Sequence, residues 1–157
     1  MTDEQRNAGL TAGSALPKLT VGPITRTQLA LFAGASGDHN PIHLDDAEAR
    51  AVGLPGVIVQ GMLMMAMLGR VLTDLAGLGR IRTFDTRFTA MAVPGDVLTF
   101  SGVVLEITRP GNDPLADLDI RAVNQKGDIL LKGKASVMIG GSLKGHDDTI
   151  KRDSDDV

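Results

Sequence analysis

The spacing of hydrophobic and polar positions predicts helices in the first half of the chain and strands in the second. A first short helix is expected to begin at the N-cap Thr25 and to end at Gly34 or Gly37. A second is expected over residues 45–53, with acidic residues in its first turn, where the helix dipole favours them. A short alternating segment over residues 18–23 predicts a strand ahead of both helices.

The longest helix is predicted for Gly61–Gly77, and it is the most apolar part of the chain. Residues 62–68 are apolar on every side, which is typical of a helix that is buried all round. The surrounding apolar run is interrupted by Gln60 and Arg70, and it falls short of the roughly 18 to 20 residues that a membrane span requires. We therefore expect a core helix and no association with a membrane.

After residue 79 the pattern changes to the alternation of strands, which we expect to be linked by hairpins and to pair antiparallel. Helices followed by strands indicate an α+β fold, in which an antiparallel sheet wraps the apolar helix and buries all its sides. The predicted strands lie at residues 80–91, 97–108, 117–125 and 129–139, with turns at 93–96 and 126–128 and a loop at 109–116.

The length of 157 residues predicts one folded domain, which we place at residues 17–140. Residues 1–16 are expected to be flexible, and the polar, Asp-rich residues 141–157 to form a disordered tail. The polar start does not resemble a signal peptide and the chain has no cysteine, so we expect a cytoplasmic protein. A net charge of -3 and an aromatic content of 3% argue against nucleic acid as a partner.

The stretch "FAGASGDHNPIHLDD", residues 32–46, concentrates the reactive side chains of the sequence. His39 and His43 are four residues apart, a spacing that places two metal ligands on one face of a helix. Pro41 lies between them and disfavours helical geometry, and the remaining histidine, His146, is distant in the sequence. The sequence therefore does not favour a metal site.

Two interpretations of this stretch remain. In the first it is a capped turn, with Asp45 as the N-cap of the following helix. In the second, Asp38 and His43 converge on one water molecule from either side of a rigid Asn40–Pro41 pair, and act as a general acid and base. The turn explains part of the pattern, but the combination of an acid and a histidine favours catalysis.

These residues also resemble a known family. Phe32, Gly37 and the pattern G-D-x-N-P-[apolar]-H that ends at His43 are similar to the signature of the MaoC-like (R)-specific enoyl-CoA hydratases and (3R)-hydroxyacyl thioester dehydratases. The segments "GVIVQGMLMMAML" and "RFTAMAVPGD" are similar to the central helix and a strand-and-turn segment of that family. The resemblance covers about residues 18–140 and implies a single hot dog fold, a long helix wrapped by a curved antiparallel sheet.

The resemblance also implies roles for individual residues. Asp38 and His43 would form the catalytic dyad, and Asn40 would hold the loop. The backbone N–H of Gly61, at the start of the central helix, would bind the thioester carbonyl oxygen. A helix N-terminus suits that role because its N–H groups are free and its dipole stabilises developing negative charge.

The chain departs from the family pattern at two positions. The family usually has histidine where this sequence has Gln60, and many members have serine where it has Gly69. Both positions would reshape a pocket for substrate, to which Met62 and Met65 could also contribute, although core packing is the simpler role for these methionines. The small Gly69 favours a medium, long or bulky acyl group.

The resemblance therefore implies a hydratase or dehydratase acting on a trans-2-enoyl or (3R)-3-hydroxyacyl thioester of CoA or acyl carrier protein, without a metal or redox cofactor. Two other functions stay open: a hot dog acyl thioesterase, and a non-catalytic subunit that binds acyl thioesters. An exposed sheet edge invites a second chain. We expect a homodimer, or a heterodimer with a related hot dog subunit.

Overall fold

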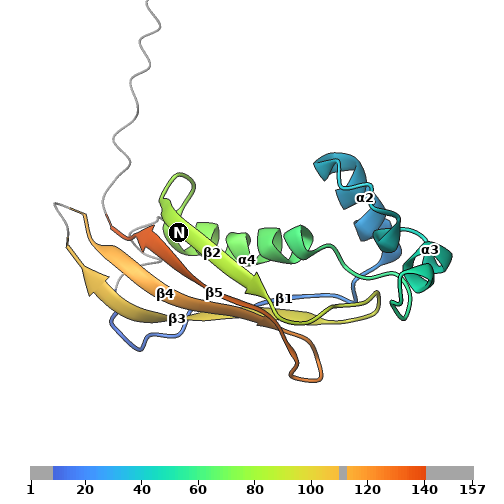
Figure 1. Cartoon of the computed structure of the whole chain (residues 1–157). Coiled ribbons are helices and arrows are strands. Elements are labelled where there is room, and N and C mark those ends of the chain that lie inside the picture. Colours follow the sequence, from blue (N-terminus) through green and yellow to red (C-terminus); the bar gives the residue numbers. More distant parts are fainter. Residues whose placement is uncertain (1–8, 110–112, 141–157) are drawn as a thin grey trace, which may run out of the picture.

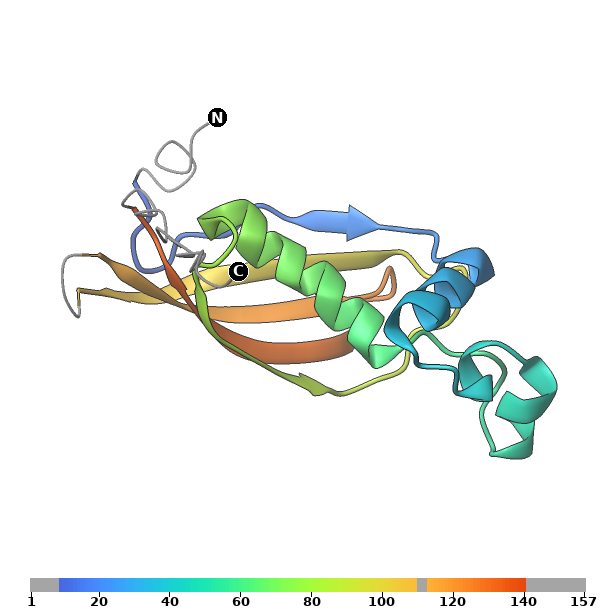
Figure 2. The same cartoon turned by 90° about the horizontal axis from the view of Figure 1, so that it is seen from above.

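A curved antiparallel sheet holds one long helix, α4 (Gly61–Ala76), along its inner face (Figures 1 and 2). The computed structural model describes residues 9–109 and 113–140. The strands follow the order β1-β3-β4-β5-β2 across the sheet, which places β1 and β2 at its edges. Their bounds are β1 (Leu19–Val21), β2 (Ile81–Phe88), β3 (Leu98–Thr108), β4 (Leu115–Val123) and β5 (Ile129–Met138).

The core lies between α4 and the sheet, as the alternation along the strands predicts. On β4, Leu118 and Ile120 are fully buried whereas Asp119 between them is exposed. Leu68 and Leu72 of α4 are fully buried on the facing side. Each such side chain stabilises the fold by about 1.5–3 kcal/mol relative to an exposed one, so this layer fixes the helix on the sheet.

The helix is not buried all round, so that part of the prediction was wrong. Met64 and Leu68 face the sheet, but Met62, Ala66 and Arg70 form an exposed stripe along the opposite side, and Met62 is 56% exposed. The physical reason is that a single curved sheet covers only one side of a helix. Among the described residues, no helix is both long and apolar enough to cross a membrane.

The strands on either side of the turn at residues 93–96 do not pair with each other, which corrects the predicted hairpin. β2 pairs with β5 at one edge, whereas β3 pairs with β1 and β4 near the other. The turn instead carries the chain across the sheet, and it is held by Asp96, whose carboxylate accepts from Val93 N (2.9 Å). The antiparallel pairing of β3 with β4 and of β4 with β5 is as predicted.

The folded region also begins earlier than expected. Leu16, which we placed in a flexible segment of residues 1–16, is 3% exposed, and its N–H donates to Gly102 O on β3 (2.9 Å). A side chain at Gly102 would collide with Leu16, since the position of a Cβ is 2.9 Å from the leucine Cδ1. Residues 1–8 and the expected tail at 141–157 lie outside the described residues.

Three short helices gather at one end of the sheet, next to the start of α4 (Figures 1 and 2). Thr25 caps the first of them as predicted: its hydroxyl accepts from Gln28 N (3.1 Å). That helix ends at Gly37, in the left-handed conformation with φ +76°. The three are α2 (Arg26–Ser36), the 3₁₀ helix η1 (Pro41–His43) and α3 (Asp46–Ala51).

Candidate active site

The turn after α2 fixes the backbone of Asp38. Gly37 takes a left-handed conformation that glycine adopts without strain, and this reverses the chain at the end of the helix. The Ser36 hydroxyl donates to Phe32 O (2.7 Å) and accepts from Asp38 N (3.2 Å). The last turn of the helix therefore holds the residue that carries the first candidate carboxylate.

The next residues form the capped turn that one interpretation of the sequence predicts. Asp38 Oδ1 accepts from Asn40 N (3.4 Å), and Asn40 Oδ1 accepts from Ile42 N (3.2 Å). Pro41 is the first residue of η1, where its missing N–H costs nothing. The Asn40 side chain thus caps η1 through this hydrogen bond.

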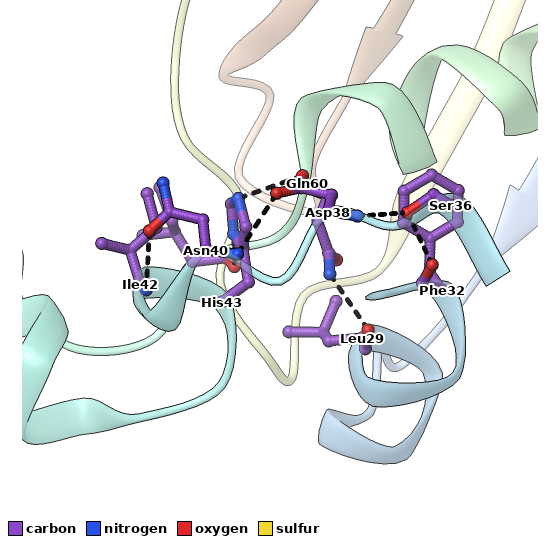
Figure 3. Close-up of polar contacts among 9 residues, drawn as sticks. Leu29, Phe32, Ser36, Asp38, Asn40, Ile42, His43 and Gln60 are labelled. Carbon is purple, nitrogen blue, oxygen red and sulfur yellow. Dashed lines mark hydrogen bonds and ion pairs between the residues drawn. The ribbon is translucent and has the colours of Figure 1, made fainter. Parts of the chain in front are cut away.

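His43 lies in η1, and its two ring nitrogens face different partners: one faces the backbone at Ile58 and the other faces Asp38 (Figure 3). Its Nδ1 is 2.9 Å from Ile58 O. Because a carbonyl oxygen can only accept, Nδ1 carries a hydrogen and donates it. The other nitrogen, Nε2, is 3.7 Å from Asp38 Oδ2. The imidazole is 9% exposed and the carboxylate 38%.

This geometry has a direct chemical consequence. With the hydrogen on Nδ1, a neutral His43 presents only a lone pair at Nε2, and an ionised Asp38 presents only acceptors. The two groups cannot hydrogen-bond to each other, and 3.7 Å is too long for such a bond. A water about 2.8 Å from each could donate one hydrogen to each, whereas a substrate hydroxyl could donate its single hydrogen to one of them. The arrangement is thus suited to hold and deprotonate an O–H group.

Gly61, the predicted oxyanion donor, is the first residue of α4. No side chain caps this helix, so its first-turn N–H groups are left for another acceptor. The ring of Phe88 lies against Gly61, with two ring carbons 3.2 Å from the position of a Cβ. Glycine at this position therefore allows the aromatic ring to cover the start of the helix.

Gln60, a predicted substrate-binding residue, is fully buried. Its Nε2 donates to Leu29 O in α2 (3.0 Å; Figure 3), and its Oε1 has no hydrogen-bond partner among the described residues. The side chain thus anchors the start of α4 to α2. A contact with substrate would have to reach its carbonyl oxygen.

The other predicted pocket residues lie along α4. Met62 is on the exposed stripe, and Met65 is half-buried, with its sulfur accepting from Thr86 Oγ1 of β2 (3.4 Å). At Gly69, the position of a Cβ is 3.5 Å from the ring of Phe84. The space that we expected this glycine to leave open is therefore bordered by an aromatic side chain.

An ion pair that no sequence motif indicates joins α2 to α3 beside the site. Arg26 donates to Asp46 Oδ2 (2.6 Å), and Asp46 Oδ1 accepts from Val57 N (2.9 Å). The hydrogen bond from Arg26 and then that from Val57 N hold the pKa of Asp46 below its usual value. These partners are 20 and 11 residues from Asp46, too far for any local pattern.

Metal ligands do not gather in the described part of the chain. Within residues 9–109 and 113–140, no group of three or more His, Cys, Asp or Glu side chains could hold a metal ion. His39, the alternative histidine of the motif, is exposed. The described side chains at the site supply the Asp38 carboxylate and the His43 imidazole, next to the helix N-terminus.

Comparison with known proteins agrees with the fold and the motif. The structure of the R-hydratase PhaJ1 from Pseudomonas aeruginosa superimposes with a TM-score of 0.75 at 33% identity, covering 87% of this chain and 86% of that one. The (R)-specific enoyl-CoA hydratase of Aeromonas caviae is 33% identical over 115 residues, which are 71% of this chain and 84% of the relative.

Longer proteins contain the same type of domain. The fatty acid synthase subunit beta of Aspergillus oryzae is 42% identical over 73 residues, and the matched part is only 4% of its length. The family model of the MaoC like domain matches residues 14–114 of this chain. The chain therefore belongs to the MaoC-like domain family, and it has that family's hot dog fold.

Proposed function

We propose that the protein is a hydratase or dehydratase that adds water to a trans-2-enoyl thioester, giving the (3R)-3-hydroxyacyl thioester, or runs in reverse. The observation that carries this proposal is the pairing of two acceptors, His43 Nε2 and Asp38 Oδ2, at 3.7 Å. The attacking water can donate to both, and the 3-hydroxyl group of the hydrated substrate can donate to one of them. The thioester is carried by CoA or acyl carrier protein, and the test substrates below distinguish the two carriers.

In the proposed reaction, Asp38 and His43 take one proton from water and one proton is delivered to the substrate. Water between Asp38 and His43 loses a proton to one of them as its oxygen bonds to C3 of the substrate. The pair then delivers a proton to C2, so that both groups return to their starting state, and the electrons that moved onto the thioester carbonyl oxygen return to re-form the carbonyl. The hydrogen bond from His43 Nδ1 to Ile58 O keeps Nε2 available as the proton acceptor. No metal or redox step is required.

Gly61 would stabilise the negative charge that develops on the carbonyl oxygen. Its N–H begins a helix of 16 residues whose first turn is not capped by a side chain. A donor preorganised toward developing charge is typically worth about 10²–10³-fold in rate. The dyad and the donor come from different parts of the chain: Ile58 O accepts from His43 Nδ1, and Gln60 directly precedes Gly61.

The direct test uses crotonyl-CoA and the corresponding acyl carrier protein thioester. We expect the absorbance of the conjugated enoyl thioester to fall without release of free thiol, and the product to be the (3R)-hydroxyacyl thioester by chiral chromatography. Release of thiol at the same rate would instead identify an acyl thioesterase. Binding without turnover would identify a non-catalytic subunit, and addition of a related hot dog chain would then be the next assay.

The assembly is proposed to be a dimer of this chain, or a heterodimer with a related subunit. β2 lies at a sheet edge and ends at Phe88, which is 45% exposed. The exposed stripe of α4, with Met62 at 56%, adds apolar surface next to the proposed donor. Light scattering of the active protein tests the assembly, because an active monomer contradicts both versions.

A further inference from the structure

The four residues before α4, Val57–Gln60, form an irregular segment in which every residue is tied to a different part of the fold. Three of the four are buried, and none belongs to a helix or strand. A segment with no secondary structure is held only by such individual contacts. The four anchors are Val57 N to Asp46 Oδ1 (2.9 Å), Ile58 N to Ile42 O (3.1 Å), Val59 N to Ala92 O (2.8 Å) and Gln60 Nε2 to Leu29 O (3.0 Å).

This segment carries or adjoins the backbone groups that the proposed function uses. The carbonyl of Ile58 accepts from His43 Nδ1 and so selects the tautomer and the orientation of the imidazole. The N–H of Gly61 follows directly after the segment. A shift of Val57–Gln60 would therefore move the base and the oxyanion donor together.

Among the four anchors, the one at Val57 is made by a charged side chain. Asp46 uses its two oxygens separately: Oδ2 accepts from Arg26 at the start of α2, and Oδ1 accepts from Val57 N. Gly56 permits this close approach, because a Cβ at its position would be 3.0 Å from Asp46 Oδ1 and its φ is +157°. The carboxylate thus joins two helices to the segment.

We propose that Asp46 is a positioning residue that holds His43 in its productive orientation through Val57 and Ile58. This inference rests on the proposed function for its catalytic consequence, and on geometry alone for its structural part. Asp46 is three residues from His43, and its hydrogen bonds go to Arg26 and Val57, so the proposed effect passes through the segment. The ion pair with Arg26 restrains the carboxylate while it accepts from Val57.

The test compares three variants with a matched control. Asp46→Ala removes both contacts, and Asp46→Asn keeps an oxygen that accepts from Val57 N but loses the ion pair. Arg26→Ala removes the ion pair and leaves the start of α3 intact. The control is Glu48→Ala, an exposed carboxylate on the same helix. All four are assayed for kcat and KM at a temperature where each is fully folded.

We expect Asp46→Ala to lower kcat by roughly 10-fold or more with a much smaller change in KM, because small misplacements of a catalytic group can cost up to about 10²-fold. Asp46→Asn and Arg26→Ala each lose the ion pair but keep an acceptor for Val57 N, so both should retain most of the activity, and Glu48→Ala should match the wild type. A fall in melting temperature with kcat unchanged in Asp46→Ala would overturn the proposal.

Two measurements keep the structural part independent of the enzyme assay. Hydrogen exchange should show loss of protection at the Val57 amide in Asp46→Ala but not in Asp46→Asn. Nitrogen NMR of His43 should show the Nδ1–H tautomer in the wild type and a mixture in Asp46→Ala. If the wild type has no hydratase activity, the proposed function fails, but these two measurements still test the positioning role of Asp46. Unchanged hydrogen exchange at Val57 and an unchanged His43 tautomer in Asp46→Ala would refute that role.

Discussion

The Phe88 ring on the edge strand β2 lies 3.2 Å from the place where a Cβ would stand at Gly61, the first residue of α4. We predict that Gly61→Ala lowers kcat/KM by roughly 10-fold or more, since the ring or the helix start must shift by a few tenths of an ångström and the N–H moves with it. Steady-state kinetics on crotonyl-CoA measures this change. Thermal unfolding should change little, because the ring is 45% exposed and can yield.

The control for this prediction is the double variant Gly61→Ala/Phe88→Ala. Removing the ring removes the collision, so the second change should restore part of the lost activity relative to Phe88→Ala alone. A double variant whose losses simply add would show that the alanine acts through something other than Phe88.

The dyad predicts a sharp loss of turnover without a loss of fold. Asp38→Asn keeps the shape of the side chain but cannot take a proton, and His43→Asn removes the titrating ring. Each should lower kcat by about 10²–10⁴-fold, and the double variant should be little worse than the poorer single one, because the two act as a unit. Circular dichroism and kinetics on the same samples separate folding from catalysis.

His39→Ala is the matched control for the dyad. His39 is exposed, whereas His43 is 8% exposed and hydrogen-bonded to Ile58 O. The variant should keep wild-type activity. An inactive His39 variant beside an active His43 variant would show that the proposal names the wrong histidine.

Phe84 is predicted to limit the length of the acyl group. Its ring stands 3.5 Å from a Cβ position at Gly69, where the sequence predicts room for a larger substrate. Phe84→Ala should raise kcat/KM for eight-carbon over four-carbon enoyl thioesters by roughly 10-fold, the scale of a few methylene contacts. Thr83→Ala, an exposed neighbour on the same strand, is the control. A chain-length profile unaffected by Phe84→Ala would place the acyl group elsewhere.

Acid should remove the stabilisation that Asp46 contributes. The hydrogen bond from Arg26, with that from Val57 N, lowers the pKa of this carboxyl from its ordinary value of 3.8. A carboxyl whose pKa is lowered on folding stabilises the protein fully at any pH above its ordinary, unfolded-state pKa. That contribution is lost as the pH falls through the lowered pKa of the folded state. Wild type should therefore melt above Asp46→Asn at pH 7, and the difference should shrink below pH 4. A constant difference across that range would contradict this assignment.

Much of the local structure is determined by the sequence itself. Thr25 and Gly37 delimit α2, Asp45 caps α3, and the apolar run from Gly61 predicts the central helix, because caps and periodicity act over the few residues of one helical turn. The motif from Asp38 to His43 likewise brings its residues together within one loop. The order of residues in this motif is enough to predict that Asp38 and His43 pair, and the atoms of the two side chains lie 3.7 Å apart.

The tertiary structure decided the contacts that no local pattern encodes. β2 pairs with β5 instead of its sequence neighbour, and α4 keeps one side exposed, since pairing and burial depend on packing summed over the whole sheet. The Ile58 carbonyl that orients His43 is a backbone group, which every residue carries, so its role leaves no mark in the sequence. The bond from Asp46 to Val57 exists only because the folded chain brings their distant positions together.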